Sequence, residues 1–257
     1  MREPLTIDIN ADAGESYGLW RMGADEELFP SLTSVNVACG FHAGDPVVMR
    51  RTVELARANG VAVGAHPGFP DTGGFGRRDL AMTADELYAA VLYQLGALEA
   101  FLRPGGARLH HVKPHGALHH RIVRDEEASD AVARAVRDFD PELPFVVLAG
   151  PAGAGMRRSA QRHGLRGVLE AFPDRAYLAD GRLAPRGTEG AIVTDPETVA
   201  SRAVRMVTQG EVVATDGAVT ALEVDTLCIH GDNPGSHEIA RAVHEALTAA
   251  GVDVTAF

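Results

Sequence analysis

Acidic and amide side chains alternate near the start of the chain. Asp8, Asn10 and Asp12 occupy every second position, and Glu15 follows shortly after them. Asp8 falls inside an apolar run, where an unpaired carboxylate is costly to bury. We therefore interpret these four residues as part of a functional site rather than as a solvated turn, with Asp12 as a candidate general base.

Histidine is frequent in this chain, which has eleven histidines beside one tryptophan and four tyrosines. His42, His66, His115 and His230 each stand just beyond a short apolar run. Imidazole exchanges protons near neutral pH, so these four are candidate catalytic residues. We interpret the histidines at 110, 111, 119 and 120 as packing or surface residues.

Other polar residues stand at the ends of apolar runs. A lysine at the end of a buried strand, such as Lys113, requires an anionic partner or a lowered pKa. Glu170 and Asp232 follow two further runs, and Asn36 lies within another. Arg77 could bind a carboxylate or simply lie on the surface.

The elements that must position these residues are short strands and longer helices in alternation. This alternation is typical of repeated βα units around a mainly parallel sheet, in which the carboxyl ends of the strands carry the ligand site. Strands are predicted at 5–9, 34–38, 61–64, 109–112, 145–149, 167–171 and 224–229.

Start signals mark several of the helices. Asp45 and Asp195 each precede a proline, and Thr83 with Glu86 fits a capping box. Helices are predicted near 46–59, 83–102, 125–138, 151–163, 195–209 and 235–250.

The length and the absence of a linker favour one domain over residues 1–257. The predicted fold class is α/β, an irregular seven-stranded (β/α) barrel similar to a TIM barrel, although an open doubly wound sheet would use the same units. The irregular segment 172–193 is predicted to form a lid or a side hairpin.

Composition excludes several classes of protein. The 24 basic and 35 acidic residues give a net charge of −11, which argues against a nucleic-acid surface. The sequence lacks an apolar stretch long enough for a membrane span, and its two cysteines suggest a reducing cytoplasm. The glycine-rich stretch 150–155 lacks the Lys-Ser/Thr of a phosphate loop, so we expect no complete nucleotide-hydrolysing site in this chain.

Six blocks in order along the chain resemble the LamB/YcsF family. Two departures are His119, where the family often has tyrosine, and the alanines at 11 and 13, where cysteine and leucine are familiar. The blocks are DINADAGES at 8–16, VNVACGFHAGD at 35–45, HPGFPD at 66–71, GFGRR at 74–78, VKPHGAL at 112–118 and HGDNP at 230–234.

The resemblance implies a barrel similar to those of glycoside hydrolases and polysaccharide deacetylases. It also implies that this chain is one subunit of an ATP-dependent 5-oxoprolinase, which opens 5-oxoproline to L-glutamate together with two partner subunits. We expect the partners to bind ATP and any divalent cation that accompanies it, and we assign no metal to this chain. A homo-oligomer is compatible with this prediction.

The expected roles follow from this reaction. Asp12 or His42 is the base for water; His66, His115 or His230 is the acid at the ring nitrogen; and Lys113 stabilises negative charge. Glu170 and Asp232 orient these groups, Arg77 binds the substrate carboxylate, and Asp8, Asn10, Glu15 and Asn36 complete the substrate site.

Two alternatives remain open. The first is a metal-dependent amidohydrolase or deacetylase that acts alone, with Asp12, His42 and His66 as ligands. The second is a scaffolding subunit without catalytic residues.

Overall fold

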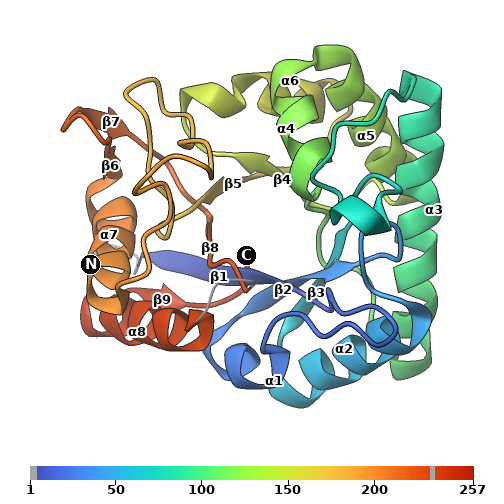
Figure 1. The fold of residues 1–257 in the computed structure, drawn as a ribbon, viewed down its shortest axis with the longest axis horizontal. Coiled ribbons are helices and arrows are strands. Elements are labelled where there is room, and N and C mark those ends of the chain that lie inside the picture. Colours follow the sequence, from blue (N-terminus) through green and yellow to red (C-terminus); the bar gives the residue numbers. More distant parts are fainter. Residues whose placement is uncertain (1–4, 232–234) are drawn as a thin grey trace.

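The computed structural model describes residues 5–231 and 235–257, and over these residues a curled parallel sheet forms the centre of the molecule (Figure 1). The strand order is β3-β2-β1-β8-β5-β4, and β9 pairs with the start of β1. The strands are β1 (Thr6–Ala13), β2 (Ser34–Ala38), β3 (Ala62–His66), β4 (Phe145–Leu148), β5 (Gly167–Ala171), β8 (Thr226–Cys228) and β9 (Asp253–Val254).

The segment predicted as a strand at 109–112 is not a regular strand. Val112 makes isolated parallel bridges to Ala65 of β3 and Phe145 of β4, so the segment lies between the two edges of the sheet. Toward β4 the ladder stops after Val112, because Pro114 has no N–H to donate. Toward β3 it continues to His115, whose N–H donates to the carbonyl of Pro67 at 2.8 Å. The prediction of a seven-stranded barrel is therefore confirmed only as an α/β fold with a curled parallel sheet that is not fully closed.

Helices surround the sheet on the outside (Figure 1). Helix α3 packs against α5, α5 against α6, and α7 against α8. The helices are α1 (Asp25–Leu28), α2 (Pro46–Asn59), α3 (Ala84–Leu102), α4 (Gly116–Arg124), α5 (Glu126–Phe139), α6 (Ala154–Arg162), α7 (Pro196–Gln209) and α8 (Ser236–Ala249). Single 3-10 turns cover Phe29–Ser31, Thr72–Gly74, Arg103–Gly105 and Pro151–Gly153.

The predicted helix starts are confirmed at three positions. Asp45 caps α2 by accepting the N–H groups of Val47 and Val48, Thr83 forms a capping box at α3, and Asp195 caps α7. Helix α4 was not predicted, and it contains His119 and His120. It begins where the N–H of Ala117 donates to the carbonyl of Gly76 at 2.9 Å, a tertiary contact that local sequence does not reveal.

The segment 172–193 is irregular and carries antiparallel bridges, from Arg175 to Ile192 and from Tyr177 to Leu183. The Arg175 guanidinium donates to the backbone carbonyls of Ala184 and Ala191, which ties the segment to itself. Movement of this segment as a lid stays a prediction. A short hairpin that was not predicted, β6 (Glu211–Val213) with β7 (Val219–Ala221), lies after α7.

The two faces of β1 have opposite character. Ile7, Ile9, Ala11 and Ala13 belong to the hydrophobic core, whereas the alternate residues between them are polar. Because side chains alternate along a strand, the polar set faces the inside of the curled sheet and the apolar set faces away from it.

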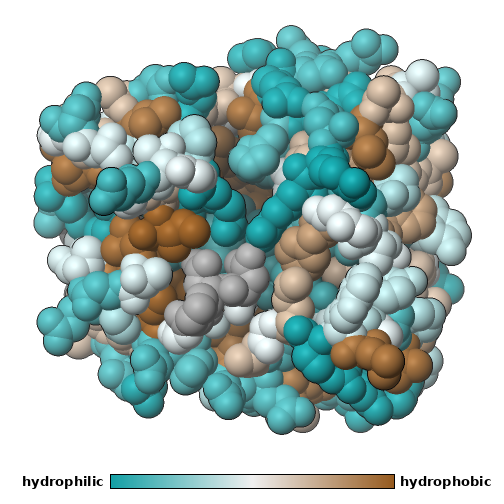
Figure 2. All heavy atoms as spheres, viewed as in Figure 1, coloured by the Kyte–Doolittle hydropathy of each residue, from teal (hydrophilic) through white to brown (hydrophobic). Residues whose placement is uncertain are grey.

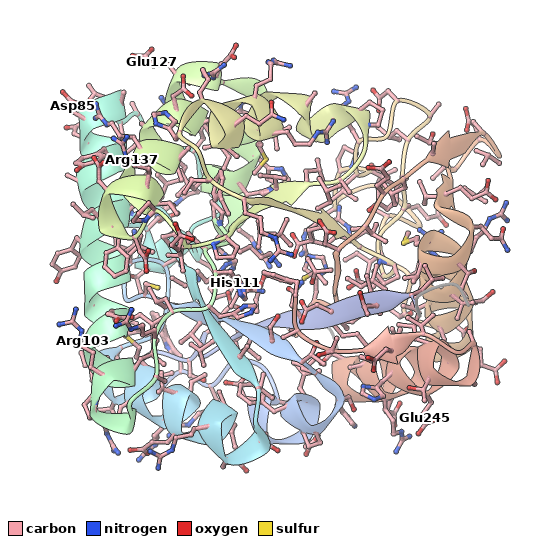
Figure 3. The ribbon with its side chains drawn as sticks, turned by 180° about the vertical axis from the view of Figure 1, so that it is seen from behind. Asp85, Arg103, His111, Glu127, Arg137 and Glu245 are labelled. Atoms are coloured by element: carbon pink, nitrogen blue, oxygen red, sulfur yellow. The ribbon has the colours of Figure 1, made fainter. Side chains whose placement is uncertain are left out.

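Polar and charged residues gather on the outside of the molecule. Figure 2 shows one face on which hydrophilic residues predominate, with smaller hydrophobic patches between them. From behind, His111 lies near the middle of the molecule, and the labelled acidic and arginine residues lie at its periphery (Figure 3).

None of the helices in the described ranges has the length and apolar character needed to cross a membrane.

Candidate functional site

The floor of the site is the carboxylate of Asp8, which is fully buried on β1. It accepts hydrogen bonds from the hydroxyl groups of Thr33, Ser34 and Thr226. Burial raises the pKa of Asp8 above its ordinary value, although the three hydroxyl groups partly oppose this shift. Asp8 is therefore held by internal partners, and its predicted contact with substrate stays untested.

Two buried amides connect the floor to the carboxylates above it. The Asn36 amide donates to Asn10 Oδ1 at 2.7 Å and to Asp12 Oδ1 at 3.0 Å. The Asn10 amide donates to Glu170 Oε1 at 3.1 Å and to the Thr226 hydroxyl at 2.6 Å. The parallel register of β1 and β2 pairs Asp12 with Asn36. The pairing of β8 with β1 and with β5 brings Thr226 and Glu170 to Asn10. The amides thus fix the positions of both carboxylates.

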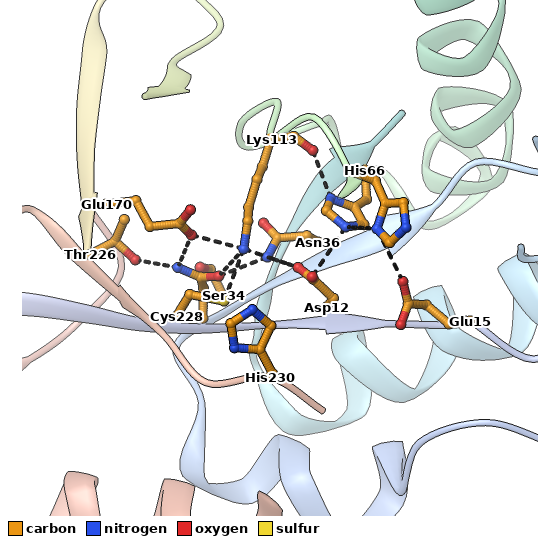
Figure 4. A network of polar contacts seen from close by, with 12 residues as sticks. Asp12, Glu15, Ser34, Asn36, His66, Lys113, Glu170, Thr226, Cys228 and His230 are labelled. Atoms are coloured by element: carbon orange, nitrogen blue, oxygen red, sulfur yellow. Dashed lines mark hydrogen bonds and ion pairs between the residues drawn. The ribbon is translucent and has the colours of Figure 1, made fainter. Parts of the chain in front are cut away.

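Lys113 lies at the centre of the site (Figure 4). Its Nζ lies 3.0 Å from Asp12 Oδ1, 2.9 Å from Glu170 Oε1 and 2.9 Å from Cys228 Sγ. Burial alone would lower the pKa of Lys113, but Asp12, Cys228 and Glu170 hold it well above its ordinary value. The anionic partner expected for a buried lysine is therefore present, and Lys113 is an ammonium ion at neutral pH.

The two carboxylates beside Lys113 differ in their proton affinity. Burial opposes ionisation of Asp12, yet His66 and Lys113 hold its pKa well below the ordinary value. Burial raises the pKa of Glu170, and Lys113 offsets this only in part. The Asp12 side chain also keeps 15% of its surface exposed, against 1% for Glu170. Asp12 is thus the anion that a substrate can reach.

Three histidines meet beside Asp12. His66 Nε2 lies 3.2 Å from Asp12 Oδ2 and 2.9 Å from His115 Nδ1. The other ring nitrogen of His66 donates to the carbonyl of Lys113, and that of His115 donates to the carbonyl of Phe75. The His42 ring stacks on His115, with centroids 3.8 Å apart.

Glu15 completes this cluster. Its Oε1 lies 3.2 Å from His42 Nε2 and 3.5 Å from His115 Nδ1. Burial lowers the pKa of His42 well below its ordinary value and that of His115 to about 3. Both rings are therefore neutral at physiological pH, with lone pairs available to a ligand.

No metal is expected on this chain from its sequence, but the structure offers a candidate site. One ligand atom from each of four residues lies within 4.8 Å of the others, and these residues are Glu15, His42, His66 and His115. The set shares His42 and His66 with the metal ligands of the alternative hypothesis.

His230 follows the carboxyl end of β8, the strand next to β1. Its Nδ1 lies 2.8 Å from Asp174 Oδ2, and its ring stacks on Phe172 at 5.4 Å between centroids. Sequence reasoning missed Asp174 as the partner of this histidine, although it follows the end of β5 by only three residues. Asp232, predicted as an orienting carboxylate, lies outside the described residues.

Of the two remaining residues, His111 is buried beneath the site and Arg77 is exposed. His111 is buried with its Nε2 2.7 Å from Asn36 Oδ1, so this residue supports the site from below, a role that its sequence context did not signal. Arg77 is exposed, and its guanidinium lies 4.9 Å from the centroid of the Phe75 ring. Its predicted contact with a substrate carboxylate is untested.

Comparisons with known proteins cover nearly the whole chain. A protein from Thermus thermophilus that is named as the A subunit of 5-oxoprolinase is 58% identical over 253 residues, which are 98% of this chain and 100% of the relative. A protein of the same name from Deinococcus radiodurans is 54% identical over 252 residues, 98% of this chain and 97% of the relative.

Two solved structures are also similar to this chain over most of its length. The crystal structure of a lactam utilization protein from Thermus thermophilus has a TM-score of 0.93 at 57% identity, covering 98% of this chain and 100% of that one. The catalytic domain of a peptidoglycan N-acetylglucosamine deacetylase from Eubacterium rectale has a TM-score of 0.50 at 12% identity, covering 100% and 90%, and shares the fold alone. Residues 7–257 match the LamB/YcsF family, and the chain belongs to it.

Proposed function

We propose that this chain is the A subunit of a 5-oxoprolinase, which opens the lactam of 5-oxoproline to L-glutamate while two partner subunits bind ATP. The names of relatives that match over almost their full length support this assignment. The observation in the site that carries the proposal is the buried Lys113 ammonium beside the reachable carboxylate of Asp12. A cation next to a base suits the attack of water on a carbonyl-type carbon.

The reaction needs activation because the lactam is a resonance-stabilised amide. Transfer of the terminal phosphoryl group of ATP to the lactam oxygen gives an imidate that water can attack at the ring carbon. Asp12 takes a proton from this water as the new C–O bond forms, and Lys113 stabilises the negative charge that develops. Cleavage of the C–N bond then opens the ring to an acyl phosphate, and a second water hydrolyses this acyl phosphate to phosphate and glutamate.

The ring nitrogen must gain a proton as the C–N bond breaks. His230 is the acid in this proposal, because its Nδ1 is paired with Asp174 and proton exchange is thereby directed to Nε2. Glu170 positions Lys113, and Asn36 positions Asp12. The exposed guanidinium of Arg77 binds the substrate carboxylate as a bidentate pair.

The test is glutamate formation from 5-oxoproline and ATP by this chain reconstituted with its two partner subunits. We expect Asp12→Asn, which keeps the shape of the side chain, to lower turnover by about 10²-fold or more. Glu245→Gln, an exposed change on α8, is the matched control and retains turnover. Full activity of Asp12→Asn in an assembled complex would instead favour a scaffolding role.

A further inference from the structure

Four potential metal ligands from separate parts of the chain converge at the carboxyl ends of the strands. Glu15 follows β1, His42 follows β2, His66 ends β3, and His115 precedes α4. All four are buried, with at most 8% of each residue exposed. Such a set brings one carboxylate and three imidazoles together away from bulk water.

The spacing of their ligand atoms suits a small metal ion. The separations are 3.2 Å from Glu15 Oε1 to His42 Nε2, 3.5 Å from the same oxygen to His115 Nδ1, and 2.9 Å from His115 Nδ1 to His66 Nε2. A tetrahedral ion with bonds of about 2.0–2.1 Å places its ligand atoms about 3.3–3.4 Å apart. These three separations are thus close to those of a zinc coordination shell, and all the ligand atoms lie within 4.8 Å of one another.

Backbone carbonyls fix which ring nitrogens face the centre. His66 Nδ1 lies 2.7 Å from the carbonyl of Lys113, and His115 Nε2 lies 2.8 Å from the carbonyl of Phe75. A carbonyl can only accept, so both of these nitrogens carry hydrogen. The other nitrogens, His66 Nε2 and His115 Nδ1, lie 2.9 Å apart, and the lone pairs that would hold a proton or a metal ion point to the same place. Metal-bound histidines commonly have this second hydrogen bond to a carbonyl.

A positive charge between these lone pairs removes their repulsion. A single proton can bridge only two atoms, whereas Glu15 and His42 also direct ligand atoms to the same place. The carboxylate of Asp12 adds a further oxygen, 3.2 Å from His66 Nε2. A metal ion satisfies several of these atoms at once.

Neighbouring glycines keep the rings in place. A Cβ on Gly68 would lie 2.7 Å from His42 Nδ1, and a Cβ on Gly76 would lie 2.7 Å from His42 Cβ and 2.8 Å from His115 Cδ2. The rings of His42 and His115 are stacked within 4° of parallel. The ligand set is thus packed against backbone and held before any ion arrives.

We propose that Glu15, His42, His66 and His115 bind one divalent transition-metal ion, with Zn²⁺ as the ion that the ligand types and spacing fit. The ion lies next to Asp12, the base of the proposed reaction. This inference goes beyond that reaction and does not depend on it, because binding is measured on the chain without partners or substrate.

The experiment is titration of chelator-treated protein with Zn²⁺ by calorimetry, together with elemental analysis of the purified chain. We expect one Zn²⁺ per chain, and we expect Glu15→Gln and His115→Gln to weaken binding by about 10-fold or more. His120→Gln, an exposed histidine on the same helix that follows His115, is the matched control and keeps the affinity of the unaltered chain. Circular dichroism of each variant reports whether the fold is intact.

A spectroscopic measurement identifies the ligands directly. Co²⁺ in place of Zn²⁺ gives visible absorption bands whose intensity reports the coordination number, and Glu15→Gln should change these bands while His120→Gln should not. Absence of stoichiometric Zn²⁺ and Co²⁺ binding by the folded chain overturns the proposal. It is also overturned if both ligand variants bind Zn²⁺ with the affinity of the unaltered chain. If the metal-free chain still forms glutamate in the complex, the metal site is not required and the proposed function stands.

Discussion

At the scale of single residues, Lys113 forms ion pairs with both Asp12 and Glu170. In the described part of the chain it is the cation that lies between these two carboxylates. These two carboxylates are held within hydrogen-bonding distance of one ammonium group, and the Asn36 and Asn10 amides share their oxygens. Loss of the ammonium group leaves buried negative charge without compensation, which costs more than the pair itself contributes. The residue therefore stabilises the fold as well as the proposed transition state.

We expect Lys113→Met to lower the free energy of unfolding by about 3–5 kcal/mol, because it leaves the Asp12 and Glu170 carboxylates facing each other. Urea denaturation measures this change. The double variant Lys113→Met with Glu170→Gln removes one of the two charges and should recover part of the loss. A double variant no more stable than the single one would show that charge compensation is not the cause.

Among the elements, strand β3 must approach a buried ring very closely. A Cβ on Gly64 would lie 2.2 Å from His111 Nε2, the atom that contacts Asn36. Gly64 pairs with Asn36 in the register of β2 and β3. The absence of a side chain at this position is therefore what allows His111 to reach the amide that holds Asp12.

Gly64→Ala should lower the free energy of unfolding by about 1–3 kcal/mol, because the added methyl group displaces the His111 ring. The matched control is Gly96→Ala in helix α3, where a Cβ meets no neighbouring atom within 4 Å. That change should raise stability by about 1 kcal/mol, since alanine favours a helix. Denaturation curves that show the same sign for both variants would contradict this account.

Helix α1 is joined to the end of β1 by a carboxylate. Asp25 accepts the N–H of Gly14 at 2.9 Å, and burial raises the pKa of Asp25 to about 6. The folded state therefore binds the proton more tightly than the unfolded chain, whose aspartate pKa is about 3.9. The stability from this group is present below about pH 4 and is lost as the pH rises through about 6.

Asp25→Asn keeps an oxygen for the Gly14 N–H but cannot ionise. We expect the variant and the unaltered chain to have similar stability at pH 4, and the variant to be the more stable at pH 7.5. Urea denaturation at both pH values measures the difference, with Glu245→Gln as a control whose effect stays constant. A variant that gains nothing at pH 7.5 would show that Asp25 does not titrate in this range.

At the scale of the whole molecule, one question is whether this chain could bind ATP. The glycine-rich stretch at 150–155 leads into α6, and close packing explains its glycines better than a phosphate loop does. A Cβ on Gly153 would lie 1.7 Å from the carbonyl oxygen of Leu148. The Arg157 guanidinium, near the position of a phosphate-loop lysine, donates to the carbonyl of Gly150 at 2.8 Å. The glycine spacing thus has a structural cause, in agreement with the proposal that ATP binds to partner subunits.

We expect the isolated chain to bind no Mg²⁺-ATP in a calorimetric titration, and the complex with its partners to bind it. The net charge of −11 also disfavours binding of a polyphosphate anywhere outside a locally basic pocket. Stoichiometric binding of ATP to the chain alone would move the phosphoryl transfer onto this subunit.

Much of the fold was predictable because it depends on local patterns. Capping residues such as Asp45 and Thr83 act within one helical turn, and apolar strands such as Gly167–Ala171 stand out from the helices around them. Strand β1 was predicted too short, at 5–9, because Asn10 and Asp12 look like part of a loop until Asn10 is seen to be buried. Helix α4 was missed because the contact with Gly76 that starts it is distant in sequence.

The sequence by itself determined the family, the parallel α/β class and the positions at strand ends where functional side chains stand, because these are properties of residue order. Only the tertiary structure decided which of them meet. Glu15, His42, His66 and His115 form one cluster, while Lys113 joins Asp12 to Glu170 in another group beside it. The physical reason is that the curvature of the sheet and the register between its strands set these distances, and neither is encoded in the spacing along the chain.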